Sequence, residues 1–190
     1  MGVTQKSIQL IEEVLKTNKV QGICDLGAQN DYRDIVIKIN PVKYPYISEW
    51  WENKGVQYLS IDLNGENGAV KWDLDKPLPT QMKFDLVCDF GTGEHTRNFE
   101  SCMTNIHNLV KLGGVVIREN PLVDNWPAHG FNYVDANFYQ ELAELNGYEI
   151  LKLETHAAMG NIIDGWNQIC VYRKTKDAPF KMAKFVCTLK

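Results

Sequence analysis

The chain has 190 residues, of which 44% are hydrophobic and 11% aromatic, and its formal net charge is −4 at pH 7. This length and apolar content suffice for one well-buried core, so we expect a single domain over residues 1–190 with its core at about 20–173. The acidic balance supplies no basic surface field to attract phosphate backbones, which argues against nucleic acid as an obligate partner.

The cysteines and the N-terminus indicate a cytoplasmic protein. The five cysteines have no C-x-x-C spacing, so we expect reduced thiols and no metal site. Residues 1–15 carry polar and acidic residues throughout instead of an uninterrupted apolar leader, and no stretch reaches the ~20 apolar residues of a membrane span. The sequence therefore predicts a soluble protein without a membrane partner, and it leaves the oligomeric state open.

Hydrophobic periodicity in the first half of the chain predicts a helix followed by buried strands. The helix covers residues 5–16 and carries its apolar positions on one face, namely Ile8, Ile11, Val14 and Leu15. Strands are expected at 22–26, 57–62 and 84–89, with a helical turn at 48–55 between the first two.

The second half continues this alternation. A helix over 98–111 is expected to end at Gly113-Gly114, and its apolar stripe comprises Phe99, Cys102, Met103, Ile106, Leu109 and Val110. Further elements are expected as a strand at 115–119, a helix at 135–146, strands at 148–155 and 166–173, and a tail from 174 to 190 with an edge strand at 183–189. The alternation indicates an α/β fold with a doubly wound, mainly parallel sheet.

Three of the predicted strands end in acids or glycines. The first two lead into Gly27 and Asp62, and residues 84–97 run from an apolar strand through glycine turns to Glu94 and His95. Because open α/β sheets bind ligands at the carboxyl ends of their strands, these residues indicate one shared cleft.

The turn after the first strand argues against a dinucleotide. Such a site uses G-x-G-x-x-G, whereas Gly27 lacks the second and third glycines and Asp31 would place negative charge beside a phosphate. S-adenosylmethionine has no phosphate, but it needs an acid near its ammonium group, an acid for its ribose hydroxyls and a polar group facing its adenine amine. Asp25, Asp62 and Asp73 are placed to supply these in chain order.

The chain resembles the class I S-adenosylmethionine-dependent methyltransferases at these positions. Asp25-Leu26-Gly27 resembles the family's first motif, with Gln29 or Asn30 in place of the usual later glycine. Asp62 matches the acid that ends the second strand, and residues 72–79 resemble the adenine loop before the fourth strand.

Two further parts of the chain extend the resemblance, which covers about residues 20–173. Residues 109–117 are similar to the family's helix end and fifth strand. Residues 91–95 and 129–133 resemble a group within the superfamily that is suspected of modifying sugars or other small molecules. The resemblance implies a seven-stranded sheet with the last strand antiparallel, helices on both faces, and methyl transfer to a small-molecule acceptor such as a sugar or sugar derivative.

The resemblance also implies where the cofactor, S-adenosylmethionine, binds. The cofactor-binding residues expected from the motifs are Asp25, Gly27, Gln29, Asp62, Leu63, Asp73, Leu74, Asp89, Phe90 and Gly91. Simpler roles compete for some of them, since Gly27 and Gly91 also suit turns that need positive φ, and Asp62 also suits a loop cap.

A base is required if the acceptor is a hydroxyl or a protonated amine, whereas a carboxylate or thiolate needs none. We expect His95 to act as this base, with Glu94 orienting it or binding substrate and His129 as the second candidate. His95 equally suits the start of the following helix, while His107 and His156 are expected to be ordinary surface residues.

Two other functions fit the same features. A methyltransferase-like fold that has lost efficient cofactor binding would act as a binding module, as the missing glycine in the first motif allows. A nucleotide-dependent oxidoreductase or epimerase would use Asp62 for a ribose, although Asp31 argues against it. We also expect residues 44–51 and 126–133 to form opposite walls of the acceptor pocket.

Overall fold

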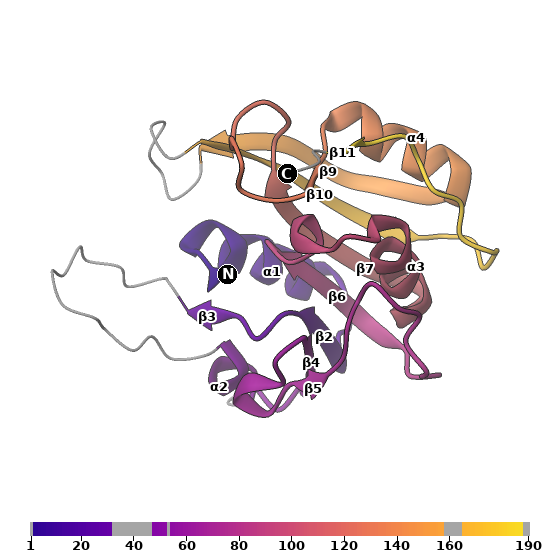
Figure 1. The fold of residues 1–190 in the computed structure, drawn as a ribbon. Helices are drawn as coiled ribbons and strands as arrows, with labels where there is room; N and C mark the ends of the chain where they lie inside the picture. Colours follow the sequence, from indigo (N-terminus) through magenta and orange to yellow (C-terminus); the bar gives the residue numbers. More distant parts are fainter. Residues whose placement is uncertain (1, 32–46, 53, 158–164, 188–190) are drawn as a thin grey trace, which may run out of the picture.

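The computed structural model describes residues 2–31, 47–52, 54–157 and 165–187. Its centre is a seven-stranded sheet (Figure 1) whose strands lie in the order β5 (Val70–Lys71), β4 (Gln57–Asp62), β2 (Gly22–Leu26), β6 (Phe84–Phe90), β7 (Val110–Pro121), β10 (Trp166–Lys174) and β9 (Tyr148–Ala157). The first five strands are parallel, and β10 is antiparallel to both of its neighbours. The predicted α/β fold with a mainly parallel sheet is confirmed.

Helices pack against both faces of the sheet and divide the core in two. The helices are α1 (Gln5–Thr17), α2 (Ile47–Glu52), α3 (Phe99–Leu109) and α4 (Ala136–Asn146). Apolar side chains of α1 and α2 pack in one cluster with Ile23 and Ile117, whereas those of α3 and α4 pack in the other with Leu26 and Val116. Because side chains alternate along a strand, neighbouring residues of each central strand contribute to opposite clusters.

Two small sheets and two short 3-10 turns complete the described chain. β1 (Gly2–Val3) pairs with β3 (Asn30–Asp31), and β8 (Asn132–Tyr133) pairs with β11 (Val186–Cys187). The turns are η1 (Glu66–Gly68) and η2 (Gly93–His95). None of the helices in the described part of the chain is both long and apolar enough to span a membrane.

Helix α3 ends earlier than its apolar pattern predicts. The helix stops at Leu109, and Val110 is already extended (φ −82°, ψ 134°) and opposite Phe84 in the β6–β7 ladder. Gly113, with φ +80°, lies within β7 and not at the helix end. Pairing with β6 therefore ends the helix before it reaches Gly113 and Gly114. Every apolar residue of the predicted stripe is nevertheless buried.

The C-terminal segment packs on the core and buries His107, so the prediction of a surface residue there is wrong. The His107 ring contacts the Tyr148 hydroxyl through Nδ1, and its Nε2 lies 2.8 Å from the carbonyl oxygen of Ala178. Within this segment the predicted edge strand is reduced to β11, which pairs with β8 and not with the main sheet; residues 188–190 lie outside the described chain.

His156 is also not an ordinary surface residue. Strand β9 continues to Ala157, two residues beyond the predicted end, and so brings the His156 ring over the sheet. Its Nε2 lies 2.8 Å from Oε1 of the buried Glu119. Burial alone would raise the pKa of Glu119, but His156, Asn167 and Ser7 hold it below its ordinary value.

Asp25 lies inside the core beneath α2. Its side chain is 1% exposed, Oδ2 accepts a hydrogen bond from the Tyr58 hydroxyl at 3.0 Å, and Oδ1 has no partner among the described residues. Burial raises the pKa of Asp25 to about 7, against smaller lowering effects from Tyr58, Cys88 and Trp51.

Asp25 should therefore make folding pH-dependent. A raised pKa means that the native state holds a proton that the unfolded state has released, so stability should fall as pH rises from about 4 to about 7. The slope contributed by one group is at most about 1.4 kcal/mol per pH unit. We expect the free energy of unfolding of Asp25→Asn, measured in urea, to lack this fall, whereas parallel pH profiles for variant and wild type would contradict the assignment.

Candidate functional site

A cavity of about 260 Å³ opens beyond the carboxyl ends of β4 and β6. It is lined by Ile61, Asp62, Leu63, Asn64, Trp72, Asp73, Leu74, Asp75, Thr92, His95 and Thr96. The lining thus brings together residues from three segments of the chain, namely 61–64, 72–75 and 92–96. Five of the residues predicted for the site are among them: Asp62, Leu63, Asp73, Leu74 and His95.

Asp62 connects the turn after β2 with the turn after β4. Its Oδ2 accepts from the backbone N–H of Ala28 at 2.9 Å, and its Oδ1 accepts from that of Asn64 at 2.8 Å. Each carboxylate oxygen keeps further acceptor capacity, because an ionised carboxylate offers about four lone-pair sites. The same side chain therefore fixes the turn after β2 and presents acceptors to the cavity.

Residues 72–75 form one wall of the cavity and are tied to the start of α3. Oδ1 of Asp75 accepts from the backbone N–H groups of Arg97 and Asn98 at 2.8 and 2.9 Å. Asp73 accepts from the N–H of Asp75 and pairs with Lys76, and these two interactions lower its pKa. Asp73 is therefore a carboxylate at neutral pH.

The turn after β2 supports the cavity without lining it. Gly27 has φ +87°, a conformation that favours glycine, and its N–H donates to the carbonyl of Ile61 at 2.7 Å. Gln29 is buried, and its Nε2 donates to the carbonyl of Leu26 at 2.7 Å and to Oγ1 of Thr92 at 3.2 Å. The side chain that stands in place of a glycine thus points into the core, and the buried Asp25 does not reach the cavity either.

Asp89 is the most heavily bonded carboxylate near the site. It lies at the end of β6 with its side chain fully buried, and it forms an ion pair with the equally buried Arg118 through Nε (2.9 Å) and Nη2 (2.7 Å). Its Oδ1 accepts from the N–H groups of Thr92 and Gly93, each at 3.0 Å. Asp89 is therefore placed to hold the turn that carries η2.

Phe90 and Gly91 follow Asp89 and also lie outside the cavity lining. The Phe90 side chain is buried in the core on the α1 face. Gly91 has φ +79°, and its N–H donates to the carbonyl of Glu119 at 3.1 Å. Their place in the structure is to pack and turn the chain between β6 and η2.

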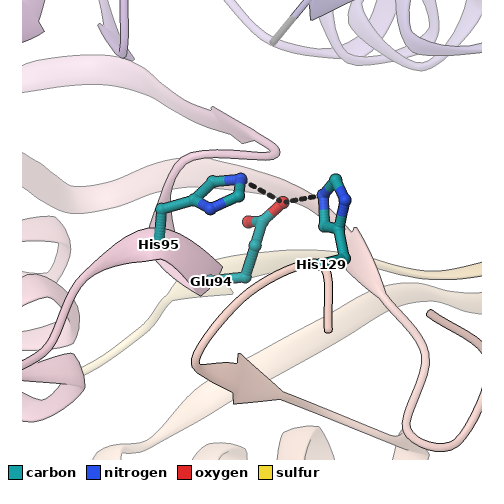
Figure 2. A group of neighbouring side chains, drawn as sticks. All are labelled: Glu94, His95 and His129. Carbon is teal, nitrogen blue, oxygen red and sulfur yellow. Dashed lines mark ion pairs between the residues drawn. The ribbon is translucent and has the colours of Figure 1, made fainter. Parts of the chain in front are cut away.

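Glu94, His95 and His129 form a cluster beside the cavity. Figure 2 shows both imidazoles pointing toward the same carboxylate oxygen, with Nε2 of His95 and Nε2 of His129 each 3.8 Å from Glu94 Oε1. Glu94 is 2% exposed, whereas the two histidine side chains are 39% and 40% exposed. Burial lowers the pKa of His95, and the charge of Glu94 only partly opposes this effect.

The loop that carries His129 is pressed against η2. Gly130 has no room for a side chain, because a Cβ there would lie 2.8 Å from the carbonyl oxygen of Glu94. The N–H of Phe131 donates to that same carbonyl at 2.7 Å, and Nδ2 of Asn132 donates to the carbonyl of Thr96. The Tyr133 hydroxyl accepts from the N–H groups of His129 and Gly130, which fixes the loop from its other side.

The structure describes only part of the two segments that were predicted to form the walls of an acceptor pocket. Residues 44–46 lie outside the described chain, and Trp51 is fully buried in the core on the α1 face. The other predicted wall lines a second cavity of about 230 Å³, which includes Trp126, Pro127 and Ala128. The proposed opposition of the two segments therefore stays a prediction.

Sequence reasoning missed Arg118 and Asn120, which support the cluster together with the predicted Asp89. Asn120 Nδ2 donates to Glu94 Oε2 at 2.9 Å, and the Asp89–Arg118 pair lies directly beside it. The available signal was the polar triplet Arg118-Glu119-Asn120, which follows the apolar residues of the strand predicted at 115–119.

No protein-family model and no curated protein matches the chain by sequence. Solved structures do match its fold. The 1,6-didemethyltoxoflavin N1-methyltransferase of Burkholderia thailandensis, solved with its substrate and S-adenosylhomocysteine, aligns over 88% of this chain and 76% of its own, at 14% identity and a TM-score of 0.60.

Two further structures show the same likeness. The N-methyltransferase NodS of Bradyrhizobium japonicum, in complex with S-adenosylhomocysteine, aligns over 90% of this chain and 87% of its own, at 12% identity and a TM-score of 0.57. An S-adenosylmethionine-dependent methyltransferase of Mesorhizobium loti aligns over 88% and 97%, at 11% identity and a TM-score of 0.58. The chain thus has the Rossmann-like fold of the class I methyltransferases, as the motifs predict.

Asp89 and Arg118 should be coupled, so that losing one partner costs more stability than losing both. Removing Arg118 leaves a buried carboxylate without its cation, so we expect Arg118→Met to lower the free energy of unfolding by about 3–5 kcal/mol in urea denaturation. The double variant Asp89→Asn with Arg118→Met should lose less, since the neutral amide oxygen still accepts from Thr92 and Gly93. A double variant less stable than Arg118→Met would refute this account of the site.

Proposed function

We propose that this protein transfers a methyl group from S-adenosylmethionine to a small-molecule acceptor. The observation that carries the proposal is the lining of the 260 Å³ cavity, which joins Asp62, residues 72–75 and His95 in the fold of the class I methyltransferases. When bound, S-adenosylmethionine supplies an activated methyl group on a sulfonium sulfur.

The residues around the cavity fit such a ligand. Asp62 offers acceptors for a pair of ribose hydroxyls, and Trp72 and Leu74 offer apolar surface for an adenine ring, with the Asp73 carboxylate close by. Gln29, which stands in the altered first motif, does not occupy the cavity, because its side chain is bonded inward to Leu26 and Thr92. This inward bonding favours cofactor binding over the alternative of a module that has lost it.

Within the cluster, we assign the contact with the acceptor to His95. Its ring lines the cavity, whereas Glu94 is buried behind it and His129 approaches from the opposite loop. A neutral imidazole in this position is placed to take the proton from a hydroxyl or amine, and methyl transfer otherwise depends chiefly on alignment of the reacting atoms. Sugars and sugar derivatives lead our candidates for the acceptor, since their hydroxyls need such a base.

The first test is ligand binding. We expect isothermal titration calorimetry to show binding of S-adenosylhomocysteine and no binding of NAD, and we expect Asp62→Ala to weaken the former by roughly 10- to 100-fold through loss of charged hydrogen bonds. Asp177→Ala, which removes an exposed acid that does not line the cavity, serves as the matched control. NAD binding would favour an oxidoreductase or epimerase, and an unchanged isotherm for Asp62→Ala would disprove the ribose assignment.

The second test is turnover. With a panel of hydroxylated small molecules as acceptors, we expect His95→Gln to lower S-adenosylhomocysteine release by ~10²- to 10⁴-fold, the range for removal of a positioned base. Affinity for S-adenosylhomocysteine should be unchanged in the same variant. Full turnover in His95→Gln would show that His95 is not the base and has only a structural role before α3.

A further inference from the structure

We propose that Glu94, His95 and His129 bind a divalent transition-metal ion of the Zn²⁺ type, with coordination positions left open toward the cavity. Metal binding as such is independent of the proposed methyl transfer. The role of the ion toward an acceptor rests on that function.

The three donor atoms converge on a single point. Glu94 Oε1 and the two histidine Nε2 atoms all lie within 4.8 Å of one another, and each Nε2 is 3.8 Å from Oε1. Zinc–ligand distances of about 2.1 Å would place tetrahedral ligand atoms about 3.4 Å apart, so small rotations of two half-exposed rings close the site. Among the described residues, neither imidazole nitrogen of His95 or His129 has a hydrogen-bond partner that would oppose these rotations.

The surrounding residues keep this arrangement in place. Asn120 holds the other carboxylate oxygen, Glu94 Oε2, at 2.9 Å, which leaves Oε1 to face the rings (Figure 2). Gly130 allows the loop to approach η2 so closely that His129 lies beside Glu94 and His95, which are more than 30 positions earlier in the chain. Metal ligands are commonly oriented by such outer hydrogen bonds.

The donor set selects the kind of ion. Two imidazoles and one carboxylate suit zinc, iron and other transition metals, whereas Mg²⁺ and Ca²⁺ prefer oxygen ligands alone. Three protein ligands leave at least one coordination position for water or substrate, the pattern of catalytic and not of structural zinc sites. Because His95 lines the cavity, an open position on the ion is accessible from it.

This geometry changes the chemistry available for an acceptor hydroxyl. When bound, the ion would act as a Lewis acid that makes a coordinated acceptor hydroxyl more acidic, and the proton would go to solvent instead of to a protein base. With its Nε2 committed to the ion, His95 would act as a ligand and not as a free base. The effect of replacing His95 would then depend on metal content.

Metal titration of the untagged, chelator-treated protein tests the proposal directly. We expect one Zn²⁺ per chain by calorimetry, and Co²⁺ should give the visible absorption bands of a four- or five-coordinate site. His95→Gln and His129→Gln should each weaken binding by at least about 100-fold, and Asn120→Ala by about 10- to 100-fold, the usual effect of removing an outer hydrogen bond. His156→Gln, whose ring lies next to Glu119 outside the cluster, should bind like wild type.

The outcomes separate this proposal from the proposed function. If Zn²⁺ and Co²⁺ do not bind, or if they bind His95→Gln, His129→Gln and wild type equally, the metal site is disproved. S-adenosylhomocysteine titrations on the same samples report on the cavity independently, so loss of the metal with retained S-adenosylhomocysteine binding overturns only this proposal. Thermal melting of each variant confirms that the protein tested is folded.

Discussion

The buried pair of Asp89 and Arg118 is the interaction on which the rest of the site depends. Two fully buried charges are costly to remove from water, and here the cost is offset by a two-point ion pair and by backbone donors on the other carboxylate oxygen. These bonds fix the turn after β6, and Asn120, donating to both Asp89 and Glu94, extends the same network to the cluster. The position of Glu94 thus depends on one ion pair in the core, whereas His129 is placed by its own loop.

The cavity depends on a second set of contacts, made by acids that bond to backbone N–H groups. Asp62 ties the turn after β2 to the end of β4, and Asp75 ties residues 72–75 to the start of α3. Neither contact needs a cation, because each acid accepts from two backbone N–H groups, which for Asp62 belong to two different loops. Side chains that hold the loops in place therefore also supply the polar surface of the cavity.

The sequence was sufficient to predict six of the seven strands of the sheet, the four helices and five residues of the cavity lining, because apolar periodicity and polar strand ends are local signals. It was not sufficient where contacts between distant segments decide. His107 is buried by the C-terminal segment, α3 ends at Leu109 because Val110 pairs with Phe84, and Asp25 faces the core because of its place in the pleat of β2. The contact between His129 and Glu94 depends on Gly130 and Asn132, which act only when the loop lies against η2. The spacing of the cysteines, from which no metal site was expected, carries no information about this cluster of histidines and a glutamate.

A crystal structure of the protein with S-adenosylhomocysteine and Zn²⁺ would test the account most directly. The account predicts ribose hydroxyls within hydrogen-bond distance of Asp62, a sulfur atom facing His95, and an ion bound by Glu94 Oε1 and the two histidine Nε2 atoms. S-adenosylhomocysteine bound away from Asp62 and residues 72–75, with the His95 ring turned from its sulfur, would contradict the central claim that this cavity is a methyl-transfer site.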